Sequence, residues 1–297
     1  MYNGYTVIDA HAHIFPDKIA GKATDGISEF YDIPMSHQGN VHELFASGDK
    51  VGIDGYLVCS AATHPSQTKA INHYIELVCK QYPQCIGFAT IHPYSESMLS
   101  EMEKILKLPF KGIKLHPDFQ QFDIDDKKVY SLYEMIEDSG LPILMHMGDP
   151  NKTHSLPRRL VKVLDDFPRL KVIAAHLGGY QRWNEAIEVL KPSERLKFDT
   201  SSSLSFMPPE KAVDFIRKYG VENCFFGVDF PMWDHKEELD RFFKLDLTDT
   251  ENKKILSEGT MQKLRTGEAT ITMSVLNEIC DLLDCQPGDL LEFVPDE

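Results

Sequence analysis

Short apolar runs alternate with amphipathic stretches along most of the chain. Apolar runs of four to eight residues, bounded by turn residues, are typical of buried strands. Eight such runs lie at residues 5–8, 55–59, 86–91, 112–116, 143–146, 172–176, 196–199 and 224–229. Stretches with apolar residues at helical spacing lie between them, at 70–80, 101–106, 160–166, 182–190 and 209–218. The pattern predicts an α/β protein in which strands and helices alternate.

This alternation also predicts how the strands are arranged, because strands joined by crossover helices form a parallel sheet. Eight units in about 230 residues fit a closed (β/α)8 barrel, which typically takes about 250 residues. A doubly wound open sheet is the alternative, but no glycine-rich phosphate loop follows the first strand. Asp9, His11 and His13 stand there instead.

A long connection follows the first strand. Residues 15–40 include Gly21, Gly26, Pro34 and Gly39 and show no clear helical periodicity before residue 41. A connection of this length without regular structure is uncommon in a compact domain and is usually functional. We expect it to be a loop that covers the site.

Charge and composition narrow the kind of partner. The formal net charge is −15, which argues against nucleic acid, because phosphate binding needs clustered Lys and Arg. An anionic small substrate is still compatible with this charge, since a local pocket can be positive. No apolar run approaches the ~20 residues that span a membrane, and the N-terminus does not read as a signal peptide. We expect a cytoplasmic protein with six reduced cysteines and no membrane or nucleic-acid partner.

Metal-competent side chains end several of the predicted strands. Side chains alternate between the two faces of a strand, so His11 and His13 project to the same side and can hold one divalent ion. The other strand-end residues are Lys114 and His116 on the fourth strand, His146 on the fifth, His176 on the sixth and Asp229 on the eighth. The C-terminal ends of the strands meet at one mouth of a barrel, where active sites are built. We therefore predict that these residues form one site.

The combined motifs resemble the amidohydrolase superfamily, over residues 5–257. They lie at 9–13, 112–117, 146, 175–179 and 227–231. The branch they resemble includes aminocarboxymuconate-semialdehyde decarboxylase-like proteins and many metal-dependent hydrolases. The resemblance implies a distorted TIM barrel with one divalent ion, commonly Zn²⁺, with Mn²⁺ or another divalent ion as alternatives. It also implies that His11, His13, His146 and Asp229 are metal ligands, and that His176 bonds the metal-bound water or the substrate.

The chemistry of this donor set agrees with that implication. Three imidazoles and one carboxylate suit zinc and leave room for a water or a substrate. Zinc lowers the pKa of bound water towards ~7, and Asp229 and His176 could then move protons. We expect metal-assisted hydrolysis of a small cytoplasmic substrate. The alternatives are non-oxidative decarboxylation of a small carboxylate and, in a different class, a non-enzymatic ligand sensor.

Four residues near the predicted mouth are candidates for binding the substrate. Lys114 could bind a carboxylate as a point charge, with a salt bridge or a metal-bridging carbamate as alternatives. His116 ends the same strand, His64 follows the second strand, and Arg182 follows His176. A loop or capping role is the alternative for His64 and Arg182. Residues 199–203 either line the pocket or cap the next helix.

The motifs of the barrel end at residue 257. We therefore divide the chain into a barrel at 1–257 and a tail at 258–297. The tail resembles the C-terminal half of a Cro-type helix-turn-helix regulator. Two basic and nine acidic residues give the tail a net charge of −7, which repels phosphate. About forty residues are marginal for an independent core. We expect a short helical tail that packs on the barrel or on a second subunit, which makes a homo-oligomer one expectation.

Overall fold

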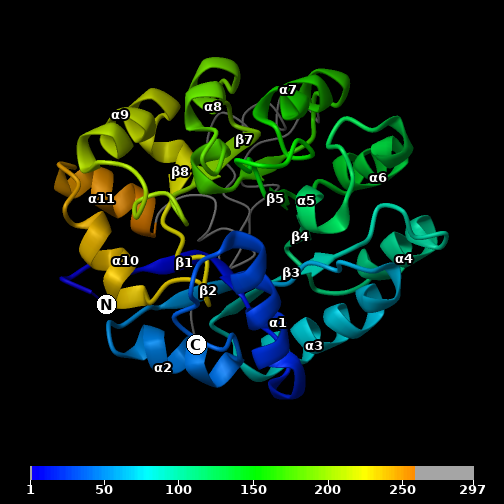
Figure 1. Ribbon diagram of the computed structural model, residues 1–297, viewed down its shortest axis with the longest axis horizontal. Helices are drawn as coiled ribbons and strands as arrows, with labels where there is room; N and C mark the ends of the chain where they lie inside the picture. The colour runs from blue at the N-terminus through cyan, green and yellow to red at the C-terminus, as the bar shows by residue number, and fades with distance from the viewer. Residues whose placement is uncertain (1, 258–297) are drawn as a thin grey trace, which may run out of the picture.

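The computed structural model describes residues 2–257. Eight strands form one parallel sheet in chain order, from β1 to β8, and the helices surround it (Figure 1). The strands are β1 Ile8–His13, β2 Gly55–Cys59, β3 Cys85–Thr90, β4 Gly112–Leu115, β5 Ile143–Met145, β6 Val172–Ala174, β7 Leu196–Asp199 and β8 Cys224–Phe225. The barrel is closed by β1 and the segment after β8, where the nitrogen of Ala10 donates to the oxygen of Phe226 over 2.9 Å. The predicted (β/α)8 barrel is therefore confirmed.

The helices occupy the connections between strands. They are α1 Asp17–Tyr31, α2 Val41–Asp49, α3 Thr68–Gln81, α4 Met98–Ile105, α5 Pro117–Gln120, α6 Tyr130–Ser139, α7 Pro157–Asp166, α8 Trp183–Val189, α9 Pro209–Tyr219, α10 His235–Phe242 and α11 Asp249–Leu256. In α7, Leu160, Val163 and Leu164 are buried while charged residues lie between them, which is why the helical spacing was readable. All five stretches with helical spacing are helices.

Two apolar layers hold the barrel together. Side chains such as Leu57, Phe88, Leu144 and Ile173 pack against one another in one buried cluster. A larger cluster contains buried residues of both strands and helices, among them Leu160. In a barrel these are the filled interior and the layer between the sheet and the helices.

One extra residue interrupts the pairing of β1 with β2. Asp9 pairs with Tyr56, but Ala12 pairs with Val58, so β1 advances three residues while β2 advances two. This is a β-bulge, which changes the face to which later side chains point. Before it Ile8 packs in the interior cluster with Leu57. After it the side chains of His11 and His13 project into the barrel mouth.

The connection after β1 is helical, which corrects our expectation of a loop. Residues Asp17–Tyr31 form α1, a helix of 15 residues. The helix contains Gly21 and Gly26, both of which weaken helical propensity, and Ala20 and Thr24 are its buried residues. The two glycines favoured the prediction of a loop, although the apolar residues of the segment recur at helical spacing. As expected, however, the segment lies over the site.

Cys59, Cys79, Cys85 and Cys224 are free thiols, in line with the expectation of reduced cysteines. Across residues 2–257, no helix combines the length and the apolar character needed to cross a membrane. The predicted tail at 258–297 lies outside the described residues.

Candidate metal centre

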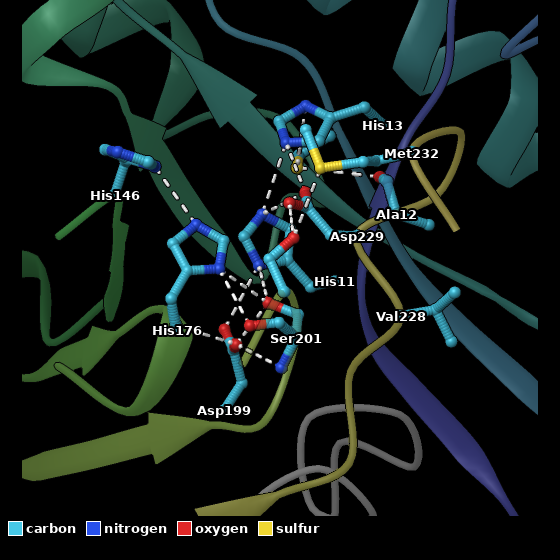
Figure 2. Close-up of polar contacts among 12 residues, drawn as sticks. His11, Ala12, His13, His146, His176, Asp199, Ser201, Val228, Asp229 and Met232 are labelled. Atoms are coloured by element: carbon cyan, nitrogen blue, oxygen red, sulfur yellow. Dashed lines mark hydrogen bonds and ion pairs between the residues drawn. The ribbon is translucent and has the colours of Figure 1, made fainter. Parts of the chain in front are cut away.

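Three side chains converge where the barrel closes. The Nε2 atoms of His11 and His13 lie 3.2 Å apart. The Oδ1 atom of Asp229 lies 3.6 Å from the first and 3.5 Å from the second. Asp229 follows β8 with φ 63°, in the left-handed region, and its nitrogen donates to the oxygen of His11 over 2.8 Å. We call these three residues the triad (Figure 2).

The triad has the spacing and the chemistry of a divalent-metal site. Nitrogen and oxygen ligands at about 2.0–2.1 Å from a tetrahedral zinc ion are separated from one another by about 3.4 Å. The three separations in the triad, 3.2, 3.5 and 3.6 Å, bracket that value. Two imidazoles and a carboxylate suit zinc and several other divalent ions. The residues present therefore fit one ion and leave positions open for further ligands.

His11 is held in the orientation that a metal ligand needs. Its Nδ1 lies 3.1 Å from Oδ2 of Asp199, which is fully buried. The other oxygen of Asp199 accepts the backbone N–H groups of His176 and Ser201, each over 3.1 Å. Because His11 donates from Nδ1, its Nε2 lone pair faces the triad. Burial, together with the nearby Lys114, lowers the pKa of His11 well below its usual range, so the ring is neutral and able to bind a cation.

Asp229 is held through its second oxygen. Oδ2 accepts the hydroxyl of Ser202 over 2.6 Å, and the indole Nε1 of Trp233 donates to that hydroxyl oxygen over 2.9 Å. Because an indole can only donate, Ser202 must give its own hydrogen to Asp229. Burial alone would raise the pKa of Asp229, but the surrounding histidines and the Ser202 hydroxyl hold it at about 2. Asp229 is thus a carboxylate that presents Oδ1 to the histidines.

Lys114 lies against the triad and away from the cavity. Its Nζ is 2.9 Å from Nε2 of His11, and the side chain is fully buried. Burial lowers the pKa of Lys114. At this distance the Lys114 amine contacts the same lone pair, on Nε2 of His11, that would bind a metal ion. Its predicted contact with a substrate carboxylate stays a prediction, as does the alternative of a carbamate.

His146 and His176 form a second pair beside the triad. In Figure 2, His176 lies between His146 and His11. Nδ1 of His146 is 3.0 Å from Nε2 of His176, while Nε2 of His146 is 2.9 Å from the oxygen of Gly148. Nδ1 of His176 is 3.0 Å from the oxygen of Ser201. The assignment of His146 as a metal ligand stays a prediction, because its two nitrogens contact His176 and Gly148 in this structure.

The tautomers of this pair follow from its partners. A carbonyl oxygen can only accept, so His146 donates from Nε2 to Gly148, and His176 donates from Nδ1 to Ser201. Burial, with the neighbouring His116, lowers the pKa of His146 well below its usual range, so the His146 ring is neutral.

A cavity of about 690 Å³ opens onto these residues. His13, His116, His146, His176 and Asp229 line its inner end. Its walls are mainly apolar and include Phe15, Pro16, Ile19, Ala23, Ile27, Phe30 and Tyr31 from the α1 segment and Ala70, Ile71 and Tyr74 from α3. Among the described residues that line it, Lys22 is the one with a full positive charge, and it is exposed on α1.

The remaining candidates lie in different places. His116 lines the cavity, whereas His64 and Arg182 are absent from the described lining. His64 is exposed at the start of a short turn, Pro65–Gln67. The guanidinium of Arg182 donates to the backbone oxygens of Asp149 and Pro150 over 2.9 and 2.8 Å. Their substrate-binding roles stay predictions.

Four residues of the site were missed or left open by the sequence. Asp199 ends β7, just as the other site residues end their strands, and this position was a usable signal. From the sequence, residues 199–203 could either line the pocket or cap the next helix. Ser202 and Trp233 act through contacts between separate loops, which a linear pattern does not reveal. Tyr31 was missed because its helix was taken for a loop.

The fold and the site define a TIM-barrel protein with metal-competent side chains at the mouth of the barrel. The amidohydrolase family model matches residues 8–264, and the chain belongs to this family. The model of the Cro/C1-type helix-turn-helix DNA-binding domain matches residues 248–296. Over 55 residues the chain is 36% identical to the uncharacterized HTH-type transcriptional regulator YozG of Bacillus subtilis (strain 168). This similarity covers 18% of the chain and 66% of that regulator.

Several solved structures share the barrel. An uncharacterized TIM-barrel protein from Bordetella bronchiseptica has a TM-score of 0.70 at 19% identity, over 89% of this chain and all (100%) of that one. A dihydroxybenzoic acid decarboxylase from Polaromonas sp. JS666, solved with manganese and the inhibitor 2-nitroresorcinol, has a TM-score of 0.68 at 16% identity, over 89% and 98%. A 5-carboxyvanillate decarboxylase from Sphingomonas paucimobilis has a TM-score of 0.66 at 15% identity, over 86% and 97%. At these identities the similarity concerns the fold.

Proposed function

We propose that the chain is a metal-dependent enzyme that acts on a small molecule with an apolar body and a carbonyl or carboxylate group. The observation that carries the proposal is the triad, of which His13 and Asp229 line an apolar cavity. An apolar cavity with a few convergent polar groups is the usual form of a small-molecule site. A ligand sensor would not need an open metal position, so we favour an enzyme over the non-enzymatic alternative.

His11, His13 and Asp229 would hold one divalent ion, with His146 as the fourth predicted ligand. The bound ion would polarise a carbonyl or carboxylate oxygen and lower the pKa of a bound water to about 7. The residues of the chain would fix the geometry. Asp199 keeps the Nε2 lone pair of His11 directed into the triad, and Ser202 holds the second oxygen of Asp229.

Hydrolysis is the first candidate reaction. A water oxygen forms the new bond to the substrate carbonyl carbon, and the leaving group takes up a proton as its bond breaks. Asp229 would accept the proton of the attacking water, and His176, which lines the cavity, would supply the one for the leaving group. Zn²⁺ is the predicted ion, and Mn²⁺ is the alternative.

Decarboxylation is the second candidate, and the apolar walls favour it. A carboxylate loses hydration when it enters an apolar cavity, whereas carbon dioxide does not depend on hydration. The carbon–carbon bond breaks, its electrons stay on the substrate carbon, and that carbon takes a proton from His176. Two of the similar structures are decarboxylases of aromatic carboxylates, which supports the same choice of substrate.

An isotope experiment separates the two reactions. The zinc- or manganese-loaded full chain would be incubated in H₂¹⁸O with carboxyl-labelled 2,6-dihydroxybenzoate, 5-carboxyvanillate and 2-pyrone-4,6-dicarboxylate. Hydrolysis places one ¹⁸O in the product, whereas decarboxylation releases labelled carbon dioxide and places a solvent hydrogen on carbon. Chelated protein and Asp229→Asn are the controls. Turnover that persists in both controls would contradict the proposal.

We further propose that residues 258–297 serve assembly and not DNA reading, since their net charge of −7 opposes phosphate binding. The similarity of this segment to helix-turn-helix domains supplies the competing interpretation. A cytoplasmic location and a homo-oligomeric state remain part of the proposal.

A further inference from the structure

Tyr31, the last residue of α1, stands in the cavity wall beside His116. Its hydroxyl oxygen lies 3.0 Å from Nε2 of His116, and both residues line the cavity. Neither the triad nor the pair of His146 and His176 uses the Tyr31 hydroxyl. Its role depends on which of the two groups donates the hydrogen in their contact.

The hydrogen bond at Nδ1, the other ring nitrogen of His116, shows which group donates to which. The backbone N–H of Phe119 donates to Nδ1 of His116 over 3.3 Å, and a backbone N–H can only donate. Nδ1 of His116 therefore holds a lone pair and no hydrogen. The hydrogen of the ring is on Nε2, and His116 donates it to the oxygen of Tyr31.

The orientation of both rings is fixed by packing. His116 is stacked between Phe119 and His146, with ring centroids 3.8 Å apart on each side. Tyr31 meets Phe30 and Tyr180 edge-on, at centroid distances of 4.8 and 5.5 Å. The hydroxyl of Tyr31 is thus presented at one place in the cavity wall.

The hydrogen of the Tyr31 hydroxyl is left for the contents of the cavity. Within residues 2–257, the hydroxyl has its one hydrogen bond with His116, in which its oxygen accepts. A phenol, with its usual pKa of about 10, keeps its hydrogen at neutral pH. Tyr74 offers a contrast, because it lines the same cavity but its hydroxyl donates to the backbone oxygen of Phe15 over 3.1 Å.

We propose that Tyr31 donates a hydrogen bond to an anionic oxygen of the bound substrate, and that the rest of the substrate is an apolar body. This inference rests on the proposed function and specifies its substrate. The apolar body lies along α1 and α3, and the carboxylate or phenolate oxygen faces Tyr31.

The test uses benzoate and toluene as probes, which have the same ring and differ in the carboxylate. Binding of each probe to the zinc-loaded full chain is measured by calorimetry for wild type, Tyr31→Phe and the matched control Tyr74→Phe. A hydrogen bond to a charged group predicts that Tyr31→Phe weakens benzoate binding by at least ~10-fold. Toluene affinity stays within about twofold, and Tyr74→Phe leaves the affinities for both probes unchanged, because it removes no free donor.

Three results would overturn the inference: benzoate binding that survives Tyr31→Phe, an equal loss in Tyr74→Phe, or no benzoate binding by wild type. Thermal melting of each variant shows whether a loss reflects a damaged fold, and toluene binding reports on the cavity itself. Failure of the proposed function has a different signature. In that case the chain shows no metal-dependent turnover, while its affinity for benzoate still depends on Tyr31.

Discussion

Ser202 gives its hydroxyl hydrogen to Oδ2 of Asp229 over 2.6 Å, so the two oxygens of this carboxylate have different tasks. Oδ1 faces the two histidines, and Oδ2 is fixed by a residue from another loop. Both residues have positive φ, 48° for Ser202 and 63° for Asp229. Such backbone conformations are uncommon for residues other than glycine and concentrate at functional sites.

Ser202→Ala should weaken metal binding by about 10-fold to 100-fold, the usual effect of removing a group that orients a ligand. The substitution leaves Oδ2 of Asp229 and Nε1 of Trp233 without their shared partner. Competition with a chelator measures the affinity. The matched control is Ser203→Ala, because Ser203 is also buried but donates to the backbone oxygen of Ser201 over 3.1 Å. Equal losses in the two variants would show that the Asp229 contact has no special role.

Purified protein should contain one divalent ion per chain, as measured by elemental analysis. Asp229→Asn should reduce metal retention and abolish turnover, since it removes a charge from the ion and a proton acceptor. His176→Asn should retain the metal and lower the rate. If it loses the ion as readily as His146→Asn, the division between ligands and proton-moving residues is wrong. Two ions per chain would instead favour a carbamate on Lys114.

Glu238 should make the protein less stable as the pH rises. Burial raises the pKa of Glu238 from 4.5 to about 8, although Arg241 opposes the shift. The folded state therefore holds a proton that the unfolded state has lost, and this contribution to stability is present below pH 4.5 and disappears as the pH rises through 8. Glu238→Gln should remove this dependence.

Urea denaturation at pH 5 and pH 9 checks the sign. Relative to wild type, Glu238→Gln should gain on the order of 4 kcal/mol in the free energy of unfolding between the two pH values. The exposed neighbour Glu237 is the matched control, and Glu237→Gln should leave the wild-type pH dependence in place. A parallel pH profile for wild type and Glu238→Gln would mean that Glu238 is already ionised in the folded protein at pH 5.

Deletion of residues 258–297 should lower the solubility, melting temperature or oligomer size of the protein. The sequence from about 272 to 284 predicts an amphipathic helix whose apolar stripe needs a covering surface. Light scattering and thermal melting of the two forms measure these effects. Tight, salt-sensitive binding of the full chain to duplex DNA, lost on truncation, would establish a regulator instead.

The eight strands could be predicted because each is a short apolar run, and the barrel followed from their alternation with helices. The site was partly predictable by the same logic, since His11, His13 and Asp229 occur near strand ends. The strand after Asn223 is regular over Cys224–Phe225 alone, shorter than predicted. Between Phe225 and Asp229 the chain is not a regular strand, and the nitrogen of Val228 donates to the side chain of Asp9 over 2.8 Å.

Other features depend on contacts that a linear pattern does not contain. Period-two alternation shows that His11 and His13 share a face, but the bulge after Asp9 decides which face it is. The direction of the hydrogen bond between His116 and Tyr31 depends on the backbone of Phe119. The glycines of residues 15–40 led to the prediction of a loop, although α1 is an amphipathic helix whose apolar residues face a cavity.

The residues that would select the substrate and the residues that would carry out the chemistry come from different segments of the chain. The triad comes from β1 and the segment after β8, whereas much of the wall comes from α1, which has two buried residues, Ala20 and Thr24. Apart from Phe30 and Tyr31, whose rings pack against Phe119 and Tyr180, the remaining positions of α1 are half-buried or exposed. Exchange of this one helix among family members offers a route to new substrates that leaves the reactive centre intact, and libraries for altered specificity are best confined to its cavity-facing positions.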